Sequence, residues 1–530
     1  ETYLPAFETL VKDAKVEAVM GAYNRVEGEP ACAHKFLMED VLRGEWGFEG
    51  HYVSDCWAIR DFHENHMVTN NPTESAALAL NTGCDVNCGC TYEYILDALR
   101  EGLITEEAID RSLIRLFTTR FLLGMFEPCE YDEIGYSEVE SKEHNKLAKK
   151  AARKSIVLLK NNGILPLDVT KLNSIGVIGP NANSRASLIG NYHGTSSRYV
   201  TVLEGIQKVC DKNDIRVHYS DGSHLFKERV ENLAFDDDRI SEAVIVAKNS
   251  DVVVLVVGLD ETLEGEEGDT GNSYASGDKE TLNLPASQMR MIETLEAVGK
   301  PIILINMTGS AMDLAFAKNN DTYGAILQAW YPGCMGGKAI ADILFGKISP
   351  SGKLPVTFYN SLDELPDFED YSMKGRTYKY MENPAQYPFG FGLTYANVEM
   401  TGASLENEEN AKSLIKSDNV YDGSISVRAN IKNTSGIKTD EVVQVYIKNH
   451  NSEYAVRNHS LCGFKRVGLD AFEEKEVTIN IPSRAFMVVN EEGKYIQDGD
   501  KFTLYVGVSQ PDEVSVSLCK VNPLKIEINL

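Results

Sequence analysis

The sequence predicts an α/β fold followed by an all-β domain, because its pattern changes three times along 530 residues. In residues 1–125, short apolar strands alternate with amphipathic helices, which is typical of parallel α/β architecture. Residues 146–398 continue this alternation with almost uninterruptedly apolar strands, as in a mostly parallel sheet covered by helices on both faces. Residues 399–530 hold short strands of alternating polarity, which predicts a β-sandwich, and the polar residues 126–145 predict a linker.

The first region is expected to contain three strands, VEAVMGAYN, HYVSDC and CDVNCG. Its last helix, TEEAIDRSLIRLFTTRFLLG, should begin with Thr105 as the N-cap and two glutamates in the first turn. The other expected helices are YLPAFETLVKD, HKFLMEDVLRGEWG, TESAALALNTG and TYEYILDALREG. A complete (β/α)8 barrel takes about 250 residues, so this region would be the C-terminal part of a barrel whose first strands are missing.

The second region shows five apolar strands: SIGVIGP, IRVHYS, DVVVLVVGLD, KPIILINMTG and AILQAWYPG. Neither G-x-G-x-x-G nor a P-loop follows any of them, so the sequence does not favour nucleotide binding. In the third region, strands such as DEVVQVYIKN and EKEVTINI show no helical periodicity, and we assign that region no chemistry.

Composition excludes two classes of partner. A net charge of -27 argues against nucleic acid, which needs a basic surface, and no apolar run is long enough for a membrane span. Among ten cysteines, the densest group is Cys84, Cys88 and Cys90, with Cys56 earlier in the chain, but the spacing matches no zinc pair and suggests no disulfide framework. We therefore expect free thiols, which favour a reducing compartment such as the cytoplasm, and no metal or cofactor. A secreted or periplasmic location stays open.

Asp55 is the first candidate for chemistry, because it follows the strand HYVS directly. Ligand sites in α/β barrels form at the carboxyl ends of strands, and Tyr23 stands at the same position one strand earlier. The alternative is that Asp55, or Ser54 beside it, caps the following helix. Position alone leaves the two interpretations equally open.

A long acidic loop at residues 258–285 is the second candidate. It follows the strand DVVVLVVG, and it carries a cluster of acids at Asp260, Glu261, Glu264, Glu266, Glu267 and Asp269. Calcium binding and a plain solvated loop are the alternatives, although the D-x-[DN]-x-[DN]-G calcium pattern is absent. One carboxylate at a strand end and another on such a loop are the groups that a glycosidase needs, with about 5–5.5 Å between them in a retaining enzyme.

Several stretches resemble glycoside hydrolase family 3. VMGAYNRVEGEPACAHKFLMEDVLRGEWGFEGHYVSDCWAI is similar to the end of that family's catalytic barrel. AWYPGCMGGKAIADILFGKISPSGKLPVTF and YPFGFGLTY resemble its α/β-sandwich domain, and TDEVVQVYIKN with LCGFKRVGL resembles its fibronectin type III-like domain. The resemblance implies that Asp55 is the nucleophile and Glu264 the general acid/base, with Glu266 second because the repeat E-G-E allows either alignment. It also implies that Tyr23 lies beside the nucleophile.

The resemblance further implies an exo-acting retaining β-glycosidase that releases a terminal sugar, with glucose as the expected sugar. However, many β-glucosidases of the family have Trp after the nucleophile, whereas here Cys56 follows it and Trp57 comes next. The S-D-C form resembles the β-xylosidase-like branch, so β-xylosidase or α-L-arabinofuranosidase activity stays open. Trp57 could stack on a sugar or fill a core or rim position.

The family's strands that carry an Asp, an Arg and a Lys-His pair for the glycone have no counterpart here. We expect a second polypeptide, or another piece of a cleaved chain, to complete the barrel, because a half-barrel exposes sheet edges. A non-catalytic sugar-binding fragment is the alternative.

Overall fold

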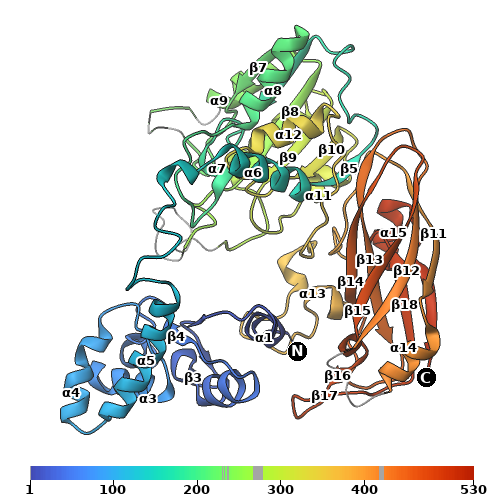
Figure 1. Ribbon diagram of the computed structural model, residues 1–530. Helices are drawn as coiled ribbons and strands as arrows, with labels where there is room; N and C mark the ends of the chain where they lie inside the picture. Colours follow the sequence, from blue (N-terminus) through green and yellow to red (C-terminus); the bar gives the residue numbers. More distant parts are fainter. Residues whose placement is uncertain (1, 230, 232, 236–237, 267–278, 417–422) are drawn as a thin grey trace. The chain divides into compact units, whose positions relative to one another are not determined.

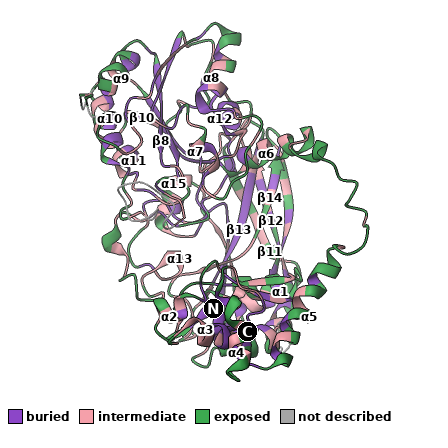
Figure 2. Ribbon diagram, turned by 90° about the vertical axis from the view of Figure 1, so that its left-hand side faces the viewer, coloured by how far each residue is buried: buried purple, intermediate pink, exposed green. Residues whose placement is uncertain are grey.

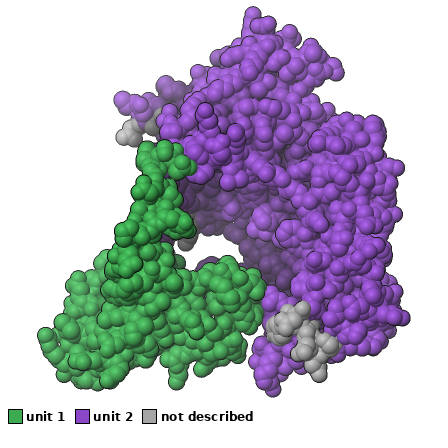
Figure 3. All heavy atoms as spheres, in the orientation of Figure 1, with its two compact units in different colours: residues 1–138 green, residues 139–530 purple. Residues whose placement is uncertain are grey.

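A computed structural model describes residues 2–229, 231, 233–235, 238–266, 279–416 and 423–530. The chain divides into two compact units, Glu1–Glu138 and Val139–Leu530, which Figure 3 colours separately. No helix within the described ranges is long and apolar enough to cross a membrane.

Unit 1, Glu1–Glu138, is built on a small parallel sheet. β1 (Ala18–Gly21) pairs with β4 (His51–Ser54), and Gly21 lies opposite Ser54. The third expected strand, CDVNCG, is reduced to a parallel bridge between Val53 and Val86. The chain leaves the ladder there because the backbone N–H of Cys88 donates to the Ser54 hydroxyl at 3.0 Å.

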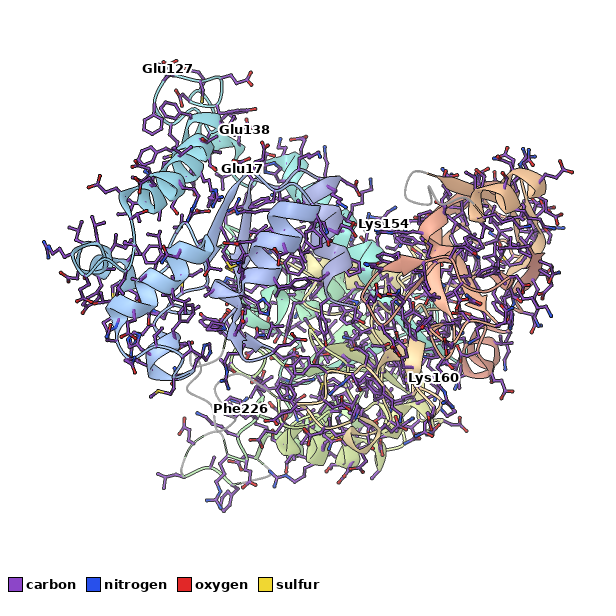
Figure 4. The ribbon with its side chains drawn as sticks, turned by 90° about the horizontal axis from the view of Figure 1, so that it is seen from below. Glu17, Glu127, Glu138, Lys154, Lys160 and Phe226 are labelled. Carbon is purple, nitrogen blue, oxygen red and sulfur yellow. A yellow bond between two sulfur atoms is a disulfide. The ribbon has the colours of Figure 1, made fainter. Side chains whose placement is uncertain are left out.

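Helices surround this sheet (Figure 1). β2 (Arg25–Val26) and β3 (Glu29–Pro30) form a short hairpin. The helices are α1 (Leu4–Lys12), η1 (Ala31–Ala33), the π-helix η2 (Phe36–Glu45), α2 (Asp61–Glu64), α3 (Pro72–Thr82), η3 (Thr91–Tyr94), α4 (Ile95–Arg100), α5 (Glu106–Leu122) and η4 (Tyr136–Glu138). The Thr105 hydroxyl accepts the backbone N–H of Ala108, so the expected cap of α5 is confirmed. Glu17, labelled in Figure 4, accepts a 2.9 Å hydrogen bond from the Thr119 hydroxyl and so links the residue before β1 to α5.

Unit 2, Val139–Leu530, begins with a six-stranded sheet of order β5-β10-β9-β8-β6-β7. The strands are β5 (Val157–Asn161), β6 (Ser174–Ile178), β7 (Arg216–Ser220), β8 (Val252–Gly258), β9 (Ile302–Met307) and β10 (Tyr323–Gln328). All neighbours are parallel except β5, which runs antiparallel to β10. β6, β8 and β9 are buried along their whole length, as Figure 2 shows in purple for β8.

Helices cover both faces of this sheet, as the apolar strands predicted (Figure 2). One core cluster joins the sheet to α6 (Lys142–Ser155), α7 (Ala186–Ile189), α8 (Val202–Cys210) and α12 (Gly336–Leu344). The other joins it to α9 (Asp238–Lys248), α10 (Ala286–Glu296) and α11 (Ala315–Lys318). Lys160 on β5, labelled in Figure 4, donates to three backbone carbonyls at the end of α11 and just beyond it, at 2.9–3.2 Å.

The rest of unit 2 is mainly β-structure. After η6 (Leu362–Glu364) and α13 (Thr377–Tyr380), a three-stranded sheet β11-β12-β15 and a four-stranded sheet β14-β13-β18-β19 share one apolar core. These strands are β11 (Val398–Leu405), β12 (Ser424–Asn433), β13 (Thr439–Asn449), β14 (Ser460–Leu469), β15 (Glu474–Pro482), β18 (Lys501–Gly507) and β19 (Leu524–Asn529), and all pairings are antiparallel. A small hairpin joins β16 (Val488–Val489) to β17 (Tyr495–Ile496).

The expectation that this region holds no helix is wrong at two places. α14 (Glu408–Ile415) and α15 (Glu513–Cys519) lie between strands. Each begins with a side-chain cap: Asn407 accepts from the Asn410 N–H and Asp512 from the Ser515 N–H. Helices of two turns are too short to show a clear hydrophobic period, and their caps were the available signal.

Candidate active site

Asp55 lies where the sequence predicted, at the carboxyl end of β4. Its backbone N–H donates to the Gly21 carbonyl at 2.9 Å, so it continues the pairing of β4 with β1 by one residue. Its carboxylate accepts the N–H of Cys56 at 2.7 Å. The next helix, α2, begins only at Asp61 and has no side-chain cap, so the structure does not use Asp55 to cap it.

A disulfide joins Cys56, the residue after Asp55, to Cys88. The expectation of free thiols is therefore wrong for this pair, and the two cysteines no longer support a reducing compartment. The spacing hid the bridge because 32 residues separate the partners and only the fold brings them together. The nearby Cys84 and Cys90 are free.

The disulfide belongs to a set of contacts that hold the Asp55 turn. The Trp57 N–H donates to the Cys88 carbonyl at 2.7 Å. Trp57 has a φ of +70°, and the residue is 48% exposed, with the Arg60 guanidinium 5.6 Å from the centroid of its ring. This exposure excludes a core role for Trp57 within unit 1. Tyr23, after β1, is also exposed.

Asp85, which sequence reasoning counted only as part of a strand, anchors this region. One carboxylate oxygen accepts the backbone N–H of Tyr52 on β4 at 2.9 Å and Arg43 of η2 at 3.0 Å. The other accepts Ser112 at 2.9 Å and Arg115 at 3.1 Å, both from α5. Burial and the neighbouring Arg115 lower the pKa of Arg43, and Asp85 works against this effect. An acid within an otherwise apolar stretch was the available signal.

Glu264 follows β8, and side chains and backbone after the neighbouring strands hold it. Its Oε2 accepts the Gly309 N–H at 2.7 Å and the Tyr331 hydroxyl at 2.5 Å. Its Oε1 accepts the Ser310 hydroxyl and lies 3.7 Å from Lys279 Nζ. Only 11% of the Glu264 side chain is exposed. Burial and the Glu264 carboxylate raise the pKa of Tyr331, whereas burial lowers the pKa of Lys279.

The other acids of this loop have separate surroundings. Asp260 accepts the backbone N–H and hydroxyl of Thr262, and Glu261 lies 2.9 Å from Nε2 of His193. The hydrogen bond to the Gly194 carbonyl, followed by the contact with Glu261, raises the pKa of His193. Glu266 has no hydrogen bond or ion pair to any other described residue, and two further acids of the predicted cluster, Glu267 and Asp269, lie outside the described residues. Across the described part of the chain, His, Cys, Asp and Glu nowhere form a group of three suited to a metal ion.

Asp55 thus belongs to unit 1, and Glu264 and Glu266 belong to unit 2. Sequence reasoning missed Tyr331, Ser310 and Lys279, because their partner Glu264 is 15 to 67 residues away along the chain. The available signal was that Ser310 and Tyr331 follow strongly apolar strands, as Glu264 does.

Three domain families match this chain. The Glycosyl hydrolase family 3 N terminal domain matches residues 1–119, the Glycosyl hydrolase family 3 C-terminal domain matches residues 156–395, and the Fibronectin type III-like domain matches residues 441–510. The matches fall in the order that the sequence resemblance implied.

Similar proteins come from bacteria, plants and fungi. A xylan 1,4-beta-xylosidase of Xylanibacter ruminicola is 32% identical over 91% of this chain and 70% of its own length. A probable beta-D-xylosidase 6 of Arabidopsis thaliana is 32% identical over 96% of this chain and 66% of its own length. The chain therefore spans about two thirds of these relatives.

Two solved structures of glycosidases are also similar to this chain. The exo-beta-xylosidase XlnD, in complex with a xylobiose aziridine probe, is 27% identical with a TM-score of 0.86, over 100% of this chain and 68% of that one. A b-glucosidase of Erythrobacter marinus is 29% identical with a TM-score of 0.84, over 99% of this chain and 69% of that one. The chain belongs to glycoside hydrolase family 3.

Proposed function

We propose that this chain carries the catalytic carboxylates of an exo-acting, retaining β-glycosidase whose preferred terminal sugar is xylose. The observation that carries the proposal is Asp55 at the carboxyl end of β4, followed at once by the Cys56–Cys88 disulfide. The S-D-C sequence there and the many β-xylosidases among the relatives favour xylose over the glucose expected from the sequence. Glucose is the competing sugar, because β-glucosidases are among the similar structures.

In the proposed mechanism, the Asp55 carboxylate attacks the anomeric carbon and the glycosidic C–O bond breaks. Glu264 gives its proton to the departing oxygen, and a covalent glycosyl-enzyme forms on Asp55. Water then attacks the anomeric carbon, gives its proton to Glu264 and releases the sugar with retained configuration. Glu266 is the second candidate for the acid/base role. The Tyr23 hydroxyl would steady the nucleophile, and the exposed ring of Trp57 would stack on a sugar.

Labelling with activated 2-deoxy-2-fluoro xyloside and glucoside tests this proposal, because such sugars form the glycosyl-enzyme but hydrolyse it slowly. Intact mass followed by peptide mapping should show one adduct, on the peptide that carries Asp55, and the xyloside should react faster. Asp55→Asn should prevent labelling. Asp61→Asn, which changes an acid six residues later, should not.

Faster labelling by the glucoside would assign glucose as the preferred sugar. Sugar binding without an adduct, in a sample that contains a complete barrel, would instead support the non-catalytic alternative. An adduct on a different carboxylate would overturn the role of Asp55.

We further propose that a second polypeptide or a cleaved fragment supplies the rest of the barrel. Among the residues that the structure describes, β1 pairs with no strand besides β4, and Met20 on β1 is exposed. Phe121 and Leu122 near the end of α5, and Leu123 just beyond it, are also exposed, with Leu122 at 71%. A strand with one unpaired edge, together with uncovered apolar side chains, forms a surface that further strands and helices of a barrel would cover.

Native mass spectrometry of the purified enzyme tests this second proposal. A companion polypeptide of about 20–30 kDa, the size of half a barrel with its entry segment, should accompany the chain. Full activity of this chain without any companion would contradict it.

A further inference from the structure

We propose that Tyr331 is the positioning residue that holds Glu264 for its role in glycosidic bond cleavage, within a cradle formed by Lys279, Gly309, Ser310 and Tyr331. The inference deepens the proposed function and rests on the role of Glu264 given there. It assigns a task to a tyrosine that lies 67 residues from Glu264 in the chain.

The cradle is assembled from the carboxyl ends of three neighbouring strands. Glu264 follows β8, Gly309 and Ser310 follow β9, and Tyr331 follows β10, and these strands are adjacent in the order β10-β9-β8. Because they are parallel, their carboxyl ends meet at one edge of the sheet. Such an edge is where α/β sheets bind ligands.

Two glycines make room for the Tyr331 ring. A Cβ on Gly190 would lie 2.6 Å from Cδ2 of Tyr331, which no real side chain tolerates. A Cβ on Gly309 would lie 3.0 Å from the ring and 3.3 Å from Oε2 of Glu264. The backbone at Gly309 therefore approaches both the carboxylate and the ring closely enough for its N–H to donate to Glu264 at 2.7 Å.

Every close polar contact of Glu264 within the described residues comes from a donor. Gly309 and Tyr331 donate to Oε2, and Ser310 donates to Oε1. Lys279 lies 3.7 Å from Oε1 and also donates to the Ser310 hydroxyl and to the Ala311 carbonyl. Hydrogen bonds to an ionised acceptor are stronger than bonds between neutral groups, so the cradle stabilises the carboxylate form of Glu264.

The carboxylate is the form that Glu264 takes once it has given its proton to the departing oxygen. The Tyr331 hydroxyl therefore favours bond cleavage, most strongly when the leaving group is a poor one that needs the proton. In the second half of the reaction Glu264 takes a proton from water, and the same bond opposes that step. Removal of the hydroxyl should slow the first step and leave the second unchanged or faster.

Tyr331→Phe removes this hydroxyl and keeps the ring against the two glycines. Tyr323→Phe is the matched control, because Tyr323 begins the same strand β10 and its buried hydroxyl donates to a carboxylate, Glu296, at 2.6 Å. Each substitution thus removes one tyrosine-carboxylate hydrogen bond, but only Tyr331 faces Glu264. The melting temperatures of the two variants show whether both substitutions destabilise the fold to the same extent.

The experiment measures kcat and KM of the purified enzyme, with any companion polypeptide, on aryl β-xylosides of decreasing leaving-group ability. With the poorest leaving group, Tyr331→Phe should lose about 10- to 100-fold in kcat/KM, the effect of one hydrogen bond to a charged group. With dinitrophenyl xyloside it should lose little. Tyr323→Phe should match the wild type across the series.

Glu264→Ala and Glu266→Ala separate the two proposals. If Glu264→Ala shows the steep dependence on the leaving group and Tyr331→Phe shows a uniform loss or none, the cradle inference fails and the proposed function stands. If Glu266→Ala alone shows the steep dependence, the role of Glu264 fails, and the cradle inference fails with it.

Discussion

Each unit of this protein buries an aspartate among cations, and the two sites differ in what surrounds them. In unit 1, Asp85 lies between Arg43 and Arg115. In unit 2, Asp342 on α12 lies between Arg153 and Lys338, and Lys347 Nζ lies 3.8 Å from its carboxylate. Burial alone would raise the pKa of Asp342, but hydrogen bonds from Lys338 and Arg153 outweigh it and lower that pKa.

Asp342 joins α6 and α12, which already pack on the six-stranded sheet through a large apolar core, so apolar contacts also hold these helices in place. Asp85 instead accepts the backbone N–H of Tyr52 on β4, where the expected third strand is only a bridge. The Asp85 carboxylate thus makes a hydrogen bond to β4 that the backbone of a third strand would otherwise make. The comparison indicates that unit 1 depends on a few polar links and one disulfide, whereas unit 2 depends on its core.

The largest effect should come from removal of these acids. Asp85→Ala leaves Arg43 and Arg115 uncompensated, and the loss of one partner from a buried ion pair costs about 3–5 kcal/mol. Peptide-resolved hydrogen exchange in rising urea should show unit 1 opening far earlier in this variant. Asp342→Ala is the counterpart, and unit 2 should lose less because its cations reach solvent more easily, at 24% and 28% exposure against 15% and 20%. Equal losses in both units would refute the contrast.

The second largest effect should come from removal of the Cys56–Cys88 disulfide. Cys56→Ser with Cys88→Ser opens a loop of 32 residues, for which chain entropy gives a loss of about 3–4 kcal/mol in unit 1. The Trp57 N–H and the Ser54 hydroxyl would still bind Cys88 backbone atoms, so we expect kcat/KM near that of the wild type at low temperature. The urea midpoint of unit 1 measures the stability, and Cys90→Ser, which changes an exposed free thiol, is the control. An unchanged midpoint would show that the polar contacts suffice.

The smallest effect should be the pH dependence of unit 2. Burial lowers the pKa of His459 below its ordinary 6.5, although its bond to Gln510 acts in the opposite direction. Below pH 6.5 His459 is protonated in the unfolded chain but stays neutral in the folded chain. The free energy of unfolding therefore falls as the pH drops below 6.5, until the pH reaches the lower pKa of the folded state. The contribution of His459 to the slope should not exceed about 1.4 kcal/mol per pH unit, and His224, whose pKa burial also lowers, adds to the slope in the same direction.

Urea unfolding of unit 2 between pH 5 and 7.5 measures this slope. His459→Gln should reduce it. His144→Asn, on the exposed side of α6, should leave it unchanged. If both variants keep the wild-type slope, other groups produce it.

Local pattern was enough to predict much of the fold. The run DVVVLVVG predicted β8, because a strand buried on both faces needs continuous apolar residues. Thr105 followed by two glutamates predicted the start of α5, since a cap acts within one helical turn. The placement of Asp55 at the end of β4 also followed from the sequence alone.

The sequence by itself thus determined most of the strands, the main helices and the positions of the two acidic candidates, because these depend on residues within one element. Only the tertiary structure decided that Cys56 bonds to Cys88, that Asp85 completes the sheet of unit 1, and that Tyr331 holds Glu264. Each of these contacts joins segments that are distant along the chain, and no local periodicity records which distant segments the packing of a sheet will bring together.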